Sequence, residues 1–175
     1  MAEFQLTKAD IRRLFEFLND ELVQEDVEGE LYLVGGAVMC LAFEARAATR
    51  DVAALLRPVE VVRQAAARVA ARAGVPDTWL NDAVKGYLGS RGDYAPFLEL
   101  DHLRVFIAVP ECLLAMKCAA MRLGAEFHDL EDVRYLLRYL NVTSVEDALA
   151  IVLRYFDERQ ILPKTRLALE ELLAS

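Results

Sequence analysis

The feature that most constrains this chain is an apolar run, residues 31–34, that ends in the glycine pair Gly35 and Gly36. A short helix-forming segment follows, and Asp51 then introduces a second apolar run at residues 52–56. Glycines let a backbone approach a phosphate closely, and the N–H groups at the start of the next helix favour anions. This order predicts a strand, a phosphate-binding turn, a helix and a second strand that begins beside an acid.

The glycine pair by itself fits two interpretations. The dinucleotide pattern G-x-G-x-x-G and the P-loop pattern G-x-x-x-x-G-K-[ST] both require residues that the sequence does not supply after Gly36. A different kind of phosphate turn and a tight packing turn between strand and helix both remain open, because glycine serves either purpose.

The acid Asp51 lacks the second carboxylate that a two-metal site needs. Residues i and i+2 of a strand share a face, and two carboxylates so placed can bridge two Mg²⁺ ions during phosphoryl transfer. Here the second position is Ala53. One carboxylate with substrate phosphates can still hold a single Mg²⁺, so the pattern predicts weak binding of a metal–nucleotide. The alternative is a surface ion pair between Arg50 and Asp51.

Composition narrows the class of protein. A chain of 175 residues corresponds to one domain or to one domain with a helical extension. We expect no membrane segment and no signal peptide, because the apolar runs are short and the N-terminal segment is acidic. The net charge of −8 argues against a broad nucleic-acid surface. Cys40, Cys112 and Cys118 lack metal-ligand spacing, which predicts reduced thiols in a cytoplasmic protein.

Secondary-structure signals separate a mixed region from a helical one. Thr7 and Asp10 predict a capped helix start. Further helices are expected at 37–44, 59–73, 78–84, 110–122, 129–140, 144–155 and 165–173, strands at 31–34, 52–56, 97–100 and 103–108, and a loop at 86–96. The first strand does not alternate, which predicts burial on both faces. We therefore expect an α+β fold, with a small mixed sheet and flanking helices in residues 1–108 and a helical part in residues 109–175.

These motifs resemble those of the nucleotidyltransferase-like proteins of the DNA polymerase β superfamily. The similarity begins with Leu-Tyr-Leu-Val-Gly-Gly-Ala and Thr-Arg-Asp-Val-x-Ala-Leu. It continues at residues 79–86, 103–111, 114–117, 129–134 and 162–166. The chain is similar in particular to AbiEii-type toxin nucleotidyltransferases and to a related uncharacterised bacterial family.

The resemblance implies a small mixed nucleotidyltransferase-type sheet and a role for individual residues. Asp51 would be the first Mg²⁺ ligand, and the second acidic ligand of the family falls on Ala53, where this chain departs from the pattern. The residues that bind the nucleotide would be Gly35, Gly36, Thr49, Arg50 and Lys117. Lys117 and Asp129 would join Asp51 as the catalytic residues.

Several of these residues have plain structural alternatives. Lys117 lies in an otherwise apolar helix, so it either reaches out at the helix edge or points at a phosphate. Asp129 and Asp132 open a helix and can simply cap it and compensate its dipole. Glu99 could supply a third carboxylate ligand, or it could lie on the polar face of an edge strand. Asn81 could meet a base or acceptor, or belong to a surface helix.

Two functional hypotheses follow from the resemblance. The first is Mg²⁺-dependent transfer of a nucleoside monophosphate from a nucleoside triphosphate to an acceptor. The acceptor would be RNA, such as a tRNA end, or a protein, in a setting that includes an antitoxin partner. The second is a catalytically degenerate module that binds a nucleotide or a protein, and Ala53 is its main support. A third interpretation is that Ala53 replaces an aspartate of an otherwise active protein.

Overall fold

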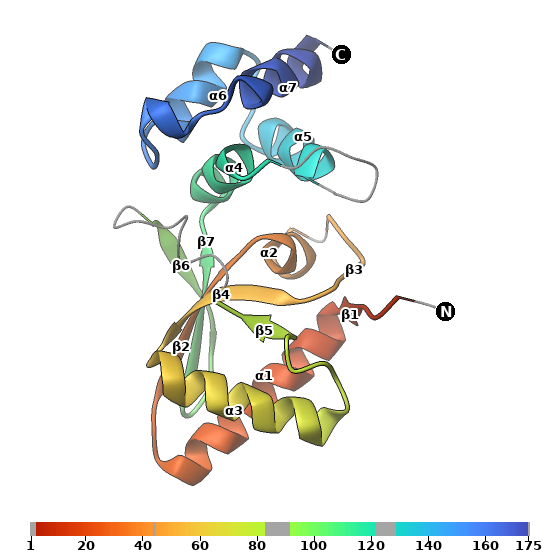
Figure 1. Ribbon diagram of the computed structural model, residues 1–175, viewed down its shortest axis with the longest axis vertical. Helices are drawn as coiled ribbons and strands as arrows, with labels where there is room; N and C mark the ends of the chain where they lie inside the picture. The colour runs from red at the N-terminus through yellow and green to blue at the C-terminus, as the bar shows by residue number, and fades with distance from the viewer. Residues whose placement is uncertain (1–2, 44, 83–91, 122–128, 175) are drawn as a thin grey trace. The chain divides into compact units, whose positions relative to one another are not determined.

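The chain divides into two compact units. The computed structural model describes residues 3–43, 45–82, 92–121 and 129–174 (Figure 1). The first unit comprises residues 1–85 and 94–108, and the second comprises residues 86–93 and 109–175. The first unit mixes strands with helices, while the described part of the second unit contains helices. The predicted α+β class is confirmed.

A mixed five-stranded sheet forms the centre of the first unit. Its order is β5-β4-β2-β7-β6. The strands are β2 (Gly29–Val34), β4 (Val52–Arg57), β5 (Leu80–Asn81), β6 (Tyr94–Glu99) and β7 (Leu103–Ala108). The central strand β2 pairs antiparallel with β4 and parallel with β7. A separate two-stranded sheet joins β1 (Leu6–Thr7) to β3 (Ala48–Thr49).

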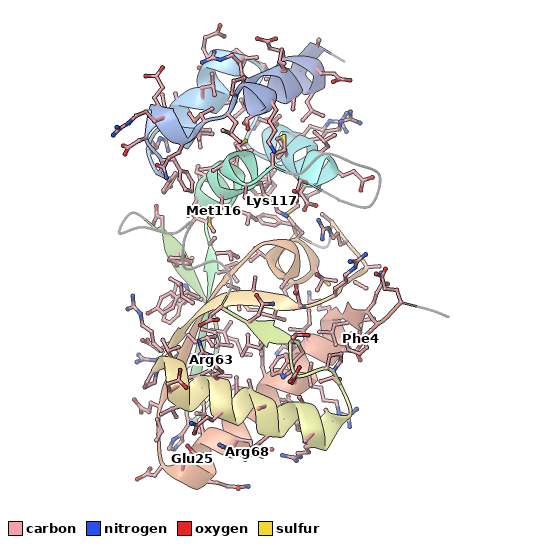
Figure 2. All side chains as sticks on the ribbon, viewed as in Figure 1. Phe4, Glu25, Arg63, Arg68, Met116 and Lys117 are labelled. Atoms are coloured by element: carbon pink, nitrogen blue, oxygen red, sulfur yellow. The ribbon has the colours of Figure 1, made fainter. Side chains whose placement is uncertain are left out.

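Two long helices pack against each other and against this sheet. They are α1 (Lys8–Glu25), which contacts β7, and α3 (Val59–Ala73), which contacts β4. Thr7 and Asp10 form the predicted capping box at the start of α1. The apolar stripe of α1 is buried as its helical spacing predicts, at Ile11, Leu14, Phe15, Leu18 and Leu22. Arg68 of α3 also pairs with Glu25 of α1, as Figure 2 shows.

The second unit is built from four α-helices and a short 3₁₀ helix within its described residues. They are α4 (Pro110–Ala119), α5 (Asp129–Tyr139), α6 (Val145–Val152), η2 (Glu158–Gln160) and α7 (Pro163–Ala174). Pro110 occupies the first turn of α4, as predicted. The Thr165 hydroxyl of α7 donates a hydrogen bond of 3.0 Å to the Cys118 carbonyl of α4. This bond connects the last helix of the second unit to the first helix of the same unit.

Two expectations about the sheet were wrong. Strand β2 alternates, with Leu31 and Leu33 buried and Tyr32 partly exposed, so within the described residues one face of the strand is covered more fully than the other. The short helix expected at residues 78–84 is absent from the described residues 78–82, where the two-residue strand β5 (Leu80–Asn81) lies instead. The Val52 N–H donates a 2.6 Å hydrogen bond to the Trp79 carbonyl, so the sheet holds this segment extended.

Other boundaries shift by a few residues. The helix expected at residues 37–44 is α2, which spans Gly36–Leu41. The loop expected at residues 86–96 ends earlier, because β6 already begins at Tyr94, and residues 86–91 lie outside the described part of the chain. Pro96 is compatible with β6 because this strand lies at the edge of the sheet.

Candidate functional site

The glycine turn lies at the end of β2, and each glycine is needed for a different reason. Gly35 has φ 74° and ψ −151°, a combination that essentially only glycine adopts. At Gly36 the constraint is space, because an added Cβ would lie 2.5 Å from Arg46 Nη1 and 3.0 Å from Thr49 Oγ1. The Arg46 guanidinium therefore lies directly against the turn and brings a positive charge to it.

The acid of the candidate site lies at the same end of the sheet. Asp51 immediately precedes β4 and is exposed. Ala53 pairs with Val34 of β2 on one side and with Asn81 of β5 on the other. Asn81 Nδ2 donates a hydrogen bond of 3.0 Å to Asp51 Oδ2. The register therefore brings the glycine turn, Asp51 and Asn81 together around the alanine.

The neighbouring predicted residues Thr49 and Arg50 have other partners. Thr49 is buried, and its hydroxyl donates a 3.3 Å hydrogen bond to the Asp51 carbonyl. Arg50 is exposed and forms an ion pair of 2.6 Å with Glu3 rather than the pair with Asp51 that the sequence alternative suggested. Thr49 therefore lies next to Gly36 and is hydrogen-bonded to the backbone of Asp51. Arg50 is an exposed residue that forms an ion pair.

Glu99 does not belong to this end of the sheet. Glu99 of β6 pairs with Arg104 of β7. Arg104 is in register with Glu30 of β2, and Glu30 is in register with Arg57 of β4. Arg57 is six residues beyond Asp51, a separation of about 20 Å along the strand. The expectation that Glu99 and Asp51 could be ligands of one metal is therefore wrong, and Glu99 is an exposed residue of the edge strand β6.

The second unit buries a charged cluster of three side chains. Lys117 of α4, which is labelled in Figure 2, is nearly buried. Its Nζ lies 2.8 Å from Asp132 Oδ2 and 3.5 Å from Asp129 Oδ1. Both aspartates lie in the first turn of α5 and are 3% exposed, so the idea that Lys117 extends to solvent is wrong. Isolated buried charges are very costly, and pairing across the two helices is what makes this cluster tolerable.

The structure also clarifies residues that the sequence left open or missed. Trp79 is fully buried and its Nε1 donates to the Ala66 carbonyl at 3.0 Å, whereas Lys85 lies outside the described residues. Arg46 was not singled out from the sequence, whereas Asp132 was considered with Asp129 as an acid that opens a helix. Asp132 had a usable signal, because residues i and i+3 of a helix share a face and Asp129 is its i+3 partner. Arg46 had none, since only folding brings it to Gly36.

The side chains that the structure describes at this end of the sheet do not fit a centre with two Mg²⁺ ions. Such a centre needs two carboxylates on one face, and here Asp51 is accompanied by an alanine and by an amide that donates to it. Among the described residues, no group of three or more histidine, cysteine, aspartate or glutamate side chains is arranged to hold a metal ion. One Mg²⁺ that arrives with a triphosphate could use Asp51 as a single ligand.

No family model, curated protein or solved structure matches this chain. The nucleotidyltransferase-like assignment therefore stays a prediction from the motifs. Within the described part of the chain, every helix is too short or too polar to cross a bilayer.

Proposed function

We propose that the first unit binds a nucleoside triphosphate at the Gly35–Gly36 turn, as a nucleotidyltransferase-type module that lacks two-metal catalysis. The observation that carries this proposal is the composition of the sheet end, where Asp51 is joined by Ala53 and Asn81 instead of a second acid. Two carboxylates would be needed to position both the attacking and the leaving oxygen through metal ions. One carboxylate with one amide is enough only to contact a metal that the phosphates already hold.

The positive side of the site supports an anionic ligand. The turn has no side chains, so phosphate oxygens can approach the backbone, and Arg46 lies against it. An arginine presents a planar set of donors that suits phosphate oxygens. Asp51 on the other side would repel a bare triphosphate, so we expect Mg²⁺ to strengthen binding by bridging the carboxylate and the phosphates.

A second candidate is Mg²⁺-dependent transfer of a nucleoside monophosphate to an RNA or protein acceptor, with an antitoxin as a regulatory partner. This candidate is favoured by Lys117 and Asp129, the catalytic residues that the resemblance implies, because they lie together with Asp132 in one buried cluster. The cluster belongs to the second unit, and its side chains already neutralise one another in part. We therefore place transfer second to binding.

Calorimetric titration of the full chain with ATP, CTP, GTP and UTP, each with and without Mg²⁺, tests the proposal. Binding in the presence of Mg²⁺ that weakens at least tenfold in Asp51→Asn and in Arg46→Met would support the site. Glu99→Gln is the matched control, since it removes a carboxylate from the opposite end of the same sheet. Absence of binding to all four nucleotides, or equal weakening in the control, would overturn the proposal.

A further inference from the structure

The segment that carries Arg46 and Asp51 lies outside the five-stranded sheet and comprises residues 45–51. The Ala45 N–H donates a hydrogen bond of 2.9 Å to the Met39 carbonyl of α2, and Asp51 leads into β4, so both ends of the segment are held. The middle of the segment forms strand β3, which belongs to the separate two-stranded sheet. The position of Arg46 therefore depends on the strand that pairs with β3.

That partner is β1, which comes from the N-terminal end of the chain (Figure 1). The pairing is antiparallel, with Leu6 opposite Thr49 and Thr7 opposite Ala48. Side chains that lie directly opposite each other in such a pair share a face and interact. Leu6 is 2% exposed and Thr49 is 7% exposed, so the face that they share is buried.

Thr49 connects this strand pair to the glycine turn. Its Oγ1 would lie 3.0 Å from a Cβ placed on Gly36, and its hydroxyl donates a hydrogen bond to the Asp51 carbonyl. Arg46 Nη1 would lie 2.5 Å from the same Cβ. A continuous set of contacts therefore leads from Leu6 through Thr49 to the turn and to the cation beside it.

The N-terminal segment is itself attached to the core. Thr7 ends β1 and also caps α1, where its side chain accepts a hydrogen bond from the Asp10 N–H. The helix that follows is fixed by its buried apolar stripe. Glu3 adds an ion pair of 2.6 Å with Arg50, but exposed pairs of this kind contribute little. We therefore expect most of the support for β3 to come from Leu6.

We propose that Leu6 is a positioning residue for the nucleotide site, because it holds residues 45–51 so that the Arg46 guanidinium lies against the glycine turn. A site that is in its binding conformation for only a fraction of the time has an apparent affinity reduced by that fraction. Truncation of Leu6 removes the side chain opposite Thr49, so part of the binding free energy goes into ordering the segment. Leu6 has this role only if the first unit binds a nucleotide as proposed above.

Hydrogen exchange of the full chain without any nucleotide tests whether Leu6 holds the segment. In Leu6→Ala the amides of residues 45–51 should exchange at least about fivefold faster than in the wild type, because local opening becomes easier. The matched control is Leu22→Ala, which truncates an equally buried leucine toward the other end of α1. It should leave these rates within about twofold, since the two sites are distant. No acceleration in Leu6→Ala, or equal acceleration in both variants, would overturn the proposal.

Calorimetric titration with the four nucleoside triphosphates in the presence of Mg²⁺ tests the consequence for binding. The dissociation constant should rise at least about fivefold in Leu6→Ala and stay within about twofold of the wild type in Leu22→Ala. Leu6→Met keeps nearly the same buried volume and should restore wild-type affinity. A constant that is unchanged in Leu6→Ala, or that rises equally in both alanine variants, would overturn the positioning role.

These measurements distinguish failure of the positioning role from failure of the nucleotide site. A wild-type chain that binds none of the four nucleotides overturns the proposed function, and the role of Leu6 falls with it. A wild-type chain that binds a nucleotide no better than Leu6→Ala overturns only the role of Leu6. Leu6→Val removes less of the side chain and replaces Leu6→Ala if that variant does not fold, with an expected change of at least about twofold in both measurements.

Discussion

Asn81 Nδ2 donates a hydrogen bond of 3.0 Å to Asp51 Oδ2, across the parallel pair of strands β5 and β4. Ala53 of β4 is in register with Asn81 of β5. The alanine side chain has no polar atom with which to contact Asp51 or Asn81. The end of the sheet therefore carries an acid–amide pair and one negative charge. Divalent cations prefer several oxygen ligands with more charge than this, which is why we expect nucleotide binding without efficient two-metal chemistry.

Ala53→Asp should create a divalent-cation site. The new carboxylate would lie two residues beyond Asp51 on the same face, so the pair would repel without metal and bind Mg²⁺ together. We expect a loss of about 1 kcal/mol in the free energy of unfolding without Mg²⁺, reversed when Mg²⁺ is added. Thermal unfolding with and without Mg²⁺ measures this effect.

Ala53→Asn is the control for that experiment, because it adds a polar side chain of the same size without charge. An equal Mg²⁺ response in both variants would contradict the charge argument. Transfer of a nucleoside monophosphate by Ala53→Asp to an RNA or protein acceptor would show that only this carboxylate separates the chain from an active enzyme.

The two glycines of the turn should respond differently to alanine. Gly35→Ala forces a side chain into the backbone conformation at φ 74°, which we expect to cost roughly 1–3 kcal/mol of stability. Gly36→Ala instead pushes aside Arg46, whose flexible end can move, so we expect a smaller loss of stability but a clear loss of nucleotide affinity. Chemical denaturation and calorimetry measure the two effects separately.

Gly74→Ala is the matched control for the glycine pair. Gly74 ends α3 with φ 69° and has open space around it. This variant should lose about 1 kcal/mol and bind nucleotide normally, because Gly74 only ends a helix. If Gly36→Ala also bound nucleotide normally, the turn would be a packing feature and the binding proposal would lose its main positive element.

Local patterns predicted the elements that depend on neighbours in sequence. The Thr7 cap and the apolar stripe of α1 were readable because a cap and a helix face involve residues only a few positions apart. The bounds of α3 were also predicted correctly, with Gly74 at its C-terminus. Strand β5 was missed because its two residues are extended only through pairing with β4, a partner about thirty residues away.

The candidate site shows the same division between local and non-local information. The glycine turn and the missing acid at Ala53 were visible as short motifs. The error about Glu99 arose because a strand's composition does not reveal which end of a sheet it reaches, and only the register fixes that. Likewise, the contact between Lys117 and Asp132 depends on how α4 and α5 pack, which no spacing in the sequence encodes.

Lys117→Met should strongly destabilise the second unit. It leaves Asp129 and Asp132 buried without their cation, and breaking a buried ion pair by removing one partner costs about 3–5 kcal/mol. Urea unfolding followed by far-UV circular dichroism measures the change. The matched control is Lys164→Met, which removes an exposed lysine from α7 and should change stability by less than about 0.5 kcal/mol.

The combined variant Lys117→Met, Asp129→Asn and Asp132→Asn distinguishes an ionic cause from a packing cause. Removing both carboxylate charges should recover much of the lost stability, because no uncompensated charge remains in the interior. If the combined variant were as unstable as Lys117→Met alone, packing of the lysine stem rather than charge would explain the loss.

The buried thiols should make stability fall at alkaline pH. Burial raises the pKa of Cys118 from 9.0 to about 12, and burial also raises the pKa of Cys40 and Cys112. Between pH 9 and about 12 the folded chain keeps the Cys118 proton while the unfolded chain releases it. The stabilisation is therefore complete below pH 9 and is lost as the pH rises toward 12, with a slope of at most about 1.4 kcal/mol per pH unit for this thiol.

Cys118→Val tests this slope, because valine fills a similar apolar volume and cannot ionise. Its free energy of unfolding should decline less steeply than that of the wild type above pH 9, while the two curves run parallel at neutral pH. Thiol labelling gives an independent check, since all three cysteines are buried and should react with a thiol reagent only after unfolding. Rapid labelling of Cys118 in the native chain would show that its surroundings open in solution. The thiol would then not be buried, and the predicted fall of the free energy of unfolding with pH would lose its cause.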